Sequence, residues 1–243
     1  DEVFEWPAPF TGEPRSILKV INRFSGIVWG DDKLAILTER WWKTRAERRI
    51  FIKPGSENFR VNLFDRYYED TYSDPGVLVT KKNEYKRNVL LTEFNGLKRI
   101  SDPDNLNIFS ISDGSSPEGD RPMILKFNIK TKIRDTIFHS AAPYFERPVF
   151  FNNGKFIINS RESAETVKNY FKVNLSDHVY TQITNFSNPY PELNGVQKKQ
   201  VSYTRLDGIN LGGTLYLPAG FKIGDTPLPV LIWAYPREFK TIE

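Results

Sequence analysis

Short apolar runs rich in β-branched and aromatic residues recur along the first 190 residues, separated by Gly, Pro, Asn and Asp. Runs of this length and composition predict β-strands joined by tight turns. The predicted strands form four groups, within residues 16–52, 77–92, 107–138 and 148–184. Turns are predicted at Asp31-Asp32, Pro54-Gly55 and Asn95-Gly96. Helical periodicity is confined to a short segment around Arg45–Arg49, so this region is predicted to be mostly β.

The C-terminal part of the chain has a different pattern. Residues 200–218 contain two strand-like segments around Asp207-Gly208, a dipeptide that accepts the positive φ angles of a tight hairpin. Residues 230–234 form a continuous apolar run, which is typical of a strand buried on both faces. A hairpin followed by a buried strand predicts a new domain beginning near Lys199. Because the chain ends soon after this strand, we expect it to be part of a longer protein.

Three motifs mark this C-terminal part: Thr204-Arg-Leu-Asp-Gly208, Gly213-Thr-Leu-Tyr-Leu-Pro-Ala-Gly220 and Leu228-Pro-Val-Leu-Ile-Trp-Ala-Tyr-Pro-Arg-Glu-Phe-Lys240. Together they resemble the entry to the hydrolase domain in the prolyl oligopeptidase family of serine peptidases. The branch most similar to them is the plastid glutamyl endopeptidase with its bacterial relatives. Upstream motifs extend the resemblance over most of the chain: Phe24-Ser-Gly-Ile-Val-Trp-Gly30, Asp74-Pro-Gly76, Gly114–Pro122, Arg161-Glu-Ser163, Asn169-Tyr-Phe171 and Asn188-Pro-Tyr-Pro191.

The resemblance implies a β-propeller that caps a serine-hydrolase domain. A four-stranded blade takes roughly 40 to 50 residues, so residues 15–186 have room for about four blades. Because the resemblance implies seven blades, the chain would hold only the later part of the ring. We therefore expect a partial β-propeller in residues 1–190. A linker and the first strands of an α/β-hydrolase domain are expected in residues 191–243.

Composition agrees with a fold of many short strands, since 14% of the residues are aromatic and the chain contains 15 glycines and 16 prolines. The absence of cysteine excludes disulfide bonds. No apolar run reaches the roughly 18 residues that a membrane-spanning helix needs, so no membrane partner is predicted. The compartment stays open, although bacterial relatives of this type are often exported, which leans toward the periplasm or secretion.

Motifs for the chemistry itself are missing from the chain. Without a Gly-x-Ser-x-Gly sequence, the hydrolase serine would lie downstream together with its aspartate and histidine, and the chain alone is predicted to be inactive. His139 and His178 are interpreted as strand-end or loop residues. No spacing of histidines, cysteines or carboxylates fits a metal site, and no nucleotide-binding motif occurs, so no cofactor is predicted.

Tyr235 is the one residue for which the resemblance implies a catalytic role. In the family, a tyrosine just after the third hydrolase strand donates its hydroxyl to the oxyanion, and Tyr235 matches that position. Acyl transfer places negative charge on the carbonyl oxygen, which a prepositioned donor stabilises. The alternative interpretation is an aromatic residue that closes a hydrophobic layer.

Arg237, Arg161 and Arg121 are the candidate substrate-binding residues, because each lies in a motif shared with the resembled branch. Cleavage after glutamate requires a cation near the specificity pocket, and a guanidinium pairs naturally with a carboxylate. Which of the three arginines binds the substrate carboxylate is left open. Arg161 could instead form an internal ion pair with Glu162, and Arg121 could brace the Gly114–Pro122 loop.

Two other classes of function compete with a peptidase. The segment Arg40–Arg49 alternates cations with Trp41 and Trp42, a pattern that suits nucleic-acid binding. However, the net charge is only +4 and Glu39 and Glu47 interrupt the run, so the tryptophans are expected to pack between blades. The other class is a propeller that acts as an interaction scaffold, which fold alone does not exclude.

The predicted function is therefore the substrate-gating propeller of a serine peptidase that hydrolyses short peptides, with a preference for acidic residues. Whether the whole enzyme is an endopeptidase or trims chain ends, as an aminopeptidase does, is left open. The predicted partner is a peptide substrate rather than nucleic acid. Self-association of the chain through open blade edges is also predicted.

Overall fold

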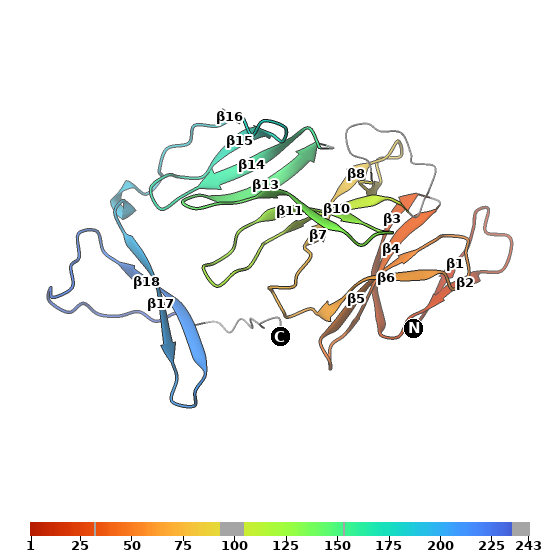
Figure 1. The fold of residues 1–243 in the computed structure, drawn as a ribbon, viewed down its shortest axis with the longest axis horizontal. Helices are drawn as coiled ribbons and strands as arrows, with labels where there is room; N and C mark the ends of the chain where they lie inside the picture. Colours follow the sequence, from red (N-terminus) through yellow and green to blue (C-terminus); the bar gives the residue numbers. More distant parts are fainter. Residues whose placement is uncertain (32, 93–104, 153, 235–243) are drawn as a thin grey trace.

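A computed structural model describes residues 1–31, 33–92, 105–152 and 154–234. The regular secondary structure of these residues consists of strands, apart from one short 3-10 helix at Pro191–Leu193. The strands make three four-stranded antiparallel sheets, two small two-stranded sheets and a separate C-terminal hairpin (Figure 1). The prediction of a mostly β chain with a partial propeller is thereby confirmed.

The first four-stranded sheet is a simple meander in which neighbouring strands follow one another in sequence. Its strands are β3 (Arg23–Asp31), β4 (Leu34–Trp41), β5 (Ala46–Ile52) and β6 (Arg60–Tyr67). The two-stranded sheet of β1 (Glu2–Glu5) and β2 (Arg15–Lys19) lies beside it. Tight turns make the meander possible: Gly55, for example, has a φ of 79° in the predicted Pro54-Gly55 turn.

The second and third sheets repeat this arrangement. The second has the order β12-β11-β10-β7, and the third runs in sequence order. A hairpin of β8 (Thr80–Lys82) and β9 (Asn88–Leu90) separates β7 from β10 along the chain. The strands of the two sheets are β7 (Val77–Leu78), β10 (Asn107–Ser112), β11 (Met123–Asn128), β12 (Arg134–His139), β13 (Phe145–Asn152), β14 (Phe156–Glu162), β15 (Asn169–Asn174) and β16 (Tyr180–Gln182).

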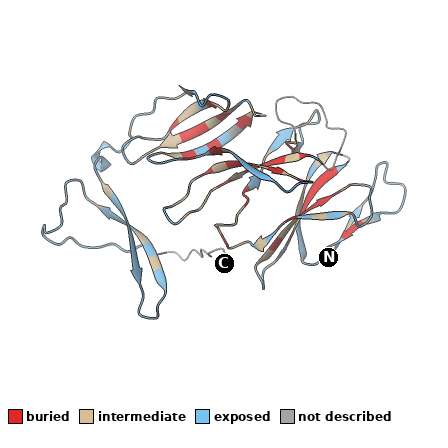
Figure 2. Cartoon of the chain, in the orientation of Figure 1, coloured by how far each residue is buried: buried red, intermediate tan, exposed pale blue. Residues whose placement is uncertain are grey.

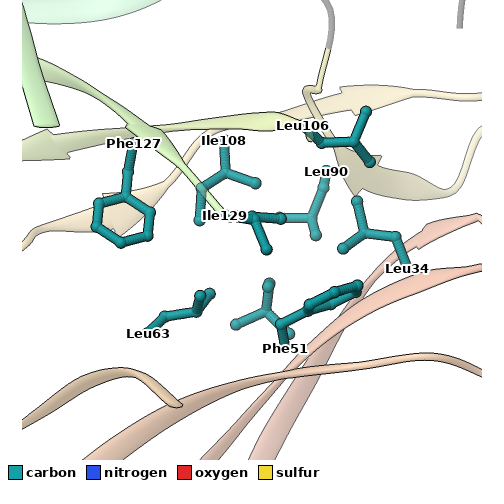
Figure 3. Packing of buried hydrophobic residues seen from close by; sticks show 9 residues of the cluster. Leu34, Phe51, Leu63, Leu90, Leu106, Ile108, Phe127 and Ile129 are labelled. Atoms are coloured by element: carbon teal, nitrogen blue, oxygen red, sulfur yellow. The ribbon is translucent and has the colours of Figure 1, made fainter. Parts of the chain in front are cut away.

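The sheets bury their faces against each other. Successive side chains of a strand point to opposite faces, so the neighbours Ile108 and Phe109 on β10 enter two different apolar clusters. Ile108 packs with residues of the first sheet, among them Leu34 and Phe51 (Figure 3). Phe109 packs with Phe151 and other residues of the third sheet. Both faces of the β10 strand are thus buried (Figure 2). A strand buried on both faces needs apolar residues at successive positions, which explains the adjacent apolar residues Ile108 and Phe109.

The C-terminal hairpin lies apart from the three sheets (Figure 1). It consists of β17 (Gln197–Thr204) and β18 (Asn210–Leu217), and Gly208 adopts the predicted positive φ, of 86°. Most of its residues are exposed (Figure 2).

The buried strand predicted at residues 230–234 is not formed in this structure. The side chains of Val230, Leu231, Ile232 and Trp233 are 78% to 93% exposed. A strand needs a neighbour for its backbone hydrogen bonds, and none lies beside this run within the described part of the chain. The assignment of residues 191–243 to an α/β-hydrolase domain therefore stays a prediction.

Candidate functional site

Two of the four predicted site residues, Tyr235 and Arg237, lie outside the described residues. The other two, Arg121 and Arg161, are on separate elements: Arg121 is in the loop before β11, and Arg161 is on β14.

Arg121 braces its loop through its backbone. Its N–H donates to the carbonyl oxygen of Gly114 at 2.9 Å. Gly114 has a φ of 61°, and a Cβ at this position would overlap the carbonyl oxygen of Arg121. Within the loop, the Ser115 hydroxyl donates to Asp120 at 2.9 Å. The predicted bracing role is therefore present, but the main chain rather than the guanidinium performs it.

Arg161 lies among aromatic rings on the third sheet. Its Cζ atom is 3.6 Å from the ring centre of Tyr144, 4.8 Å from that of Tyr180 and 5.7 Å from that of Phe171. A guanidinium over an aromatic face is attracted by the electron density of the ring. These rings therefore hold the guanidinium in place without neutralising its charge.

The carboxylate near Arg161 belongs to Glu146, directly opposite on the β13–β14 ladder. Arg161 Nε and Glu146 Oε1 are 3.7 Å apart, which is an ion pair but too long for a hydrogen bond. The alternative of an internal pair between Arg161 and Glu162 is wrong, because Glu162 pairs with Lys168 at 3.3 Å. The side chain of Arg161 is 25% exposed, whereas that of Glu146 is 7% exposed.

Neighbouring polar groups fix the Glu146 carboxylate. Asn159 Nδ2 donates to Oε1 at 3.1 Å, and the Tyr180 hydroxyl donates to Oε2 at 3.4 Å. The Ser140 hydroxyl accepts a hydrogen bond from the Glu146 backbone N–H at 2.9 Å. The carboxylate is thus anchored on two sides by groups other than Arg161.

Burial dominates the electrostatics of this cluster. It raises the pKa of Glu146 above the usual carboxyl value, although the Tyr180 hydroxyl and the Arg161 charge oppose the rise. Burial also raises the pKa of Tyr180 to about 12, and the nearby Glu146 adds to this rise. Tyr180 is therefore a proton donor throughout the physiological range.

The guanidinium of Arg161 has unused hydrogen-bonding capacity. Among the described residues, neither of its Nη atoms has a hydrogen-bonding partner, and its buried Nε also lacks one. An arginine fork of this kind can receive the two oxygens of a carboxylate. We call the group of Arg161, Glu146, Tyr144, Phe171 and Tyr180 the Arg161 cluster.

A second charged group lies on the first sheet and has a structural role. Fully buried Glu47 is close to Arg40, Arg49 and Arg66. Arg49 also donates to the carbonyl oxygen of Gly76 at 2.6 Å, and burial lowers its pKa. The group therefore ties β4, β5 and β6 to the connection that leads to β7.

The cations of the segment proposed for nucleic-acid binding are mostly paired inside the protein. Arg48 contacts Glu39 and Asp65, and Arg45 contacts Glu69 at 2.7 Å. Trp42 is 62% exposed, so the expectation that it packs between blades is wrong. It lies in the turn between β4 and β5.

His139 ends β12 and His178 lies in the turn before β16, as predicted. In the described ranges, no group of three or more His, Asp or Glu side chains is placed to hold a metal ion. No helix there is long and apolar enough to cross a membrane.

Sequence reasoning missed most of the Arg161 cluster. It selected Arg161 from a motif but not Glu146, Tyr144 or Tyr180, which are 15 to 19 positions away in the chain. Their proximity follows from the register of the successive strand pairs β13–β14, β14–β15 and β15–β16. Only a correct pairing of these strands could have revealed it.

Curated relatives match almost the whole chain. A probable chloroplastic glutamyl endopeptidase of Arabidopsis thaliana is 36% identical over 247 aligned residues, and that of Oryza sativa subsp. japonica is 34% identical. Each alignment covers 96% of this chain but only 25% and 26% of the respective relative. The chain therefore spans about a quarter of the length of these relatives. No family model matches the chain.

Solved structures give weaker likenesses. AtxE2 isopeptidase has a TM-score of 0.44 at 11% to 12% identity, covering 90% of this chain and 30% of its own. Puromycin hydrolase has a TM-score of 0.43 at 10% identity, and the match covers 84% of this chain and 35% of that structure. Oligopeptidase B from Leishmania major has a TM-score of 0.44 at 9% identity, and the match covers 87% of this chain and 34% of that structure. These scores carry no functional argument.

The sheets and the sequence relatives together define a peptidase-related β-propeller segment. The resemblance found in the motifs is confirmed, and the chain is a relative of the glutamyl endopeptidases along 96% of its length.

Proposed function

We propose that this chain is the substrate-gating propeller part of a serine-type peptidase that hydrolyses short peptides and prefers acidic residues. The observation that carries the proposal is the 36% identity to a probable glutamyl endopeptidase over 96% of the chain. Because the chain spans about a quarter of that relative, the activity belongs to a longer protein. Residues 1–190 would form the propeller and residues 191–243 the entry to the hydrolase domain.

In the longer protein, a downstream serine attacks the peptide carbonyl, a histidine moves the proton, and an aspartate orients the histidine. Tyr235 then donates its hydroxyl to the oxyanion. The chain contains no Gly-x-Ser-x-Gly motif, which supports the proposal that it is inactive by itself. The propeller limits entry to short or unfolded peptides.

An acidic preference requires a cation that meets the substrate carboxylate. Arg121, Arg161 and Arg237 are the candidates, and a guanidinium in any of these places would offer two parallel donors. A bidentate pair also selects geometry, so glutamate would be distinguished from its neutral isostere glutamine.

The experiment uses the longer protein with two fluorogenic peptides that differ only by Glu or Gln at the cleaved position. We expect faster cleavage after Glu and complete loss of activity with a serine-directed phosphonate. Hydrolysis that resists this inhibitor would exclude the serine mechanism. Equal rates on the two peptides would exclude the acidic preference while leaving the peptidase assignment intact.

A further inference from the structure

Arg161 differs in three features from an arginine that is fully satisfied by an internal ion pair. Aromatic rings fix its guanidinium, its Nη atoms have no hydrogen-bonding partner among the described residues, and its nearest carboxylate is 3.7 Å away. A structural arginine is normally satisfied by several hydrogen bonds, as Arg66 is by the carbonyl oxygens of Tyr67 and Asp70. Arg161 is instead positioned and left available.

We propose that Arg161 is the carboxylate-binding residue of this chain and that Glu146 is a built-in competitor that sets its affinity for acidic peptides. The proposal rests on the proposed function, because it assigns the acidic preference to one of three candidate arginines. It adds Glu146 as a positioning residue, which motif reasoning did not select.

The role of Glu146 follows from its own anchoring. Asn159 and Tyr180 hold its carboxylate, so it attracts Arg161 without being free to move closer. The resulting contact orients the Nε side of the guanidinium toward Glu146. The two Nη atoms, which have no hydrogen-bonding partner among the described residues, are then available to a second carboxylate.

The other candidates are less suited to this role. The Arg121 main chain is engaged in the turn with Gly114, and its side chain is not surrounded by fixing groups in any described contact. Arg147, the neighbour of Glu146 on β13, already pairs with Asp113 at 2.8 Å. Arg147 therefore serves as a matched control: an arginine on the same sheet, half exposed and already paired.

The test is isothermal titration of the 243-residue chain with two acetylated and amidated pentapeptides, Ala-Ala-Glu-Ala-Ala and Ala-Ala-Gln-Ala-Ala. The unmodified chain should bind the Glu peptide more tightly. Arg161→Gln should abolish the difference, and Arg161→Lys should restore part of it, because lysine keeps the charge but not the fork. Arg147→Gln should leave the difference unchanged.

Glu146→Gln provides the second readout. It should tighten binding of the Glu peptide by about fivefold, the equivalent of about 1 kcal/mol for one competing ion pair, and leave the Gln peptide unaffected. If Glu146 had only a structural role, the substitution would change the affinity for both peptides equally. Circular dichroism and thermal unfolding verify that each variant is folded.

Three results would overturn the proposal: equal binding of both peptides to the unmodified chain, a preference that survives in Arg161→Gln, or a Glu146→Gln variant that binds as the unmodified chain does. The titration requires no catalysis, so its failure is separate from that of the proposed function. A longer protein that cleaves after Glu with Arg161→Gln in place would retain the function and exclude this residue.

Discussion

Arg40 Nε donates a hydrogen bond of 2.6 Å to Glu47 Oε2, directly across the β4–β5 ladder. On the other side of Glu47, the ladder places Arg66 on β6 opposite the same residue. Glu47 is fully buried, so one carboxylate compensates a row of cations that includes Arg49. Removing a partner from such a group leaves buried charge uncompensated.

We therefore expect Glu47→Gln to destabilise the chain by about 3 kcal/mol. The measurement is the free energy of unfolding in urea. Glu69→Gln is the control, because Glu69 pairs with Arg45 at the surface, where its side chain is 31% exposed, and its loss should cost less than about 1 kcal/mol. Similar values for both variants would show that Glu47 is not a central partner of these arginines.

Gly114→Ala tests the bracing of the Gly114–Pro122 loop. The alanine would have to adopt a left-handed backbone conformation, and its Cβ would overlap the carbonyl oxygen of Arg121. We therefore expect the free energy of unfolding to fall by about 2 kcal/mol or more. Gly12→Ala is the matched control, since a Cβ at Gly12 meets no atom within 4 Å. Thermal unfolding of both variants gives the comparison, and an unchanged midpoint for Gly114→Ala would contradict the described turn.

The stability contributed by Glu146 should depend on pH. Its pKa is raised in the folded chain, chiefly by burial, so folding favours its protonated form. Its contribution is therefore complete below the ordinary carboxyl value of 4.5 and is lost as the pH rises through the folded pKa. The stability of the unmodified chain relative to Glu146→Gln should fall over this window.

Urea unfolding of both proteins at a series of pH values measures this difference. Glu165→Gln, at an exposed position, controls for the loss of one charge. A difference between the unmodified chain and Glu146→Gln that rises with pH would mean that the ion pair with Arg161 outweighs burial.

Tyr235→Phe addresses the proposed oxyanion donor in the longer protein. Loss of a single donor of this kind typically lowers kcat by about 100-fold, while KM should change little because the interaction forms in the transition state. Steady-state kinetics on the Glu peptide gives both constants. If kcat is retained, Tyr235 is an aromatic residue of the hydrophobic layer, which is the alternative interpretation.

Self-association of the isolated chain is expected to involve residues 230–233. Four consecutive exposed apolar residues of high β propensity favour pairing between chains. Leu231→Asp should therefore shift the chain toward the monomer in sedimentation velocity experiments. Ile223→Asp, at a position 92% exposed but outside the run, should have a smaller effect. Equal effects would indicate nonspecific association.

Much of the strand pattern could be predicted from local sequence. The apolar runs at Leu34–Trp41 and Met123–Asn128 are buried on both faces. Such runs can be recognised as strands without knowing which strands pair with them. The sequence pattern does not predict β6, because Arg60-Val-Asn-Leu-Phe-Asp-Arg-Tyr67 is an edge strand with several charged positions. It is held by its pairing with β5 and by Leu63, which is buried in the cluster that contains Phe51.

The grouping of strands into sheets was less predictable. The sequence pattern groups residues 77–79 with the following strand at Val89–Thr92. The Leu91 N–H does donate to the carbonyl oxygen of Val79 at 3.0 Å, but β7 itself pairs with β10. The intervening hairpin and the residues up to 104 separate these partners in the sequence. Pairing over such a distance depends on tertiary packing, which also explains why Glu146 could not be assigned to Arg161 beforehand.

The opposite orientations of Ile108 and Phe109 have a consequence for the order of unfolding. The middle sheet shares one apolar cluster with each neighbour, so it loses its support only when both neighbours have opened. Each sheet is then stabilised by its interfaces with the adjacent sheets, as the units of repeat proteins are. Amide protons of β10 and β11 should consequently exchange with solvent last, while those of β17 and β18 exchange first.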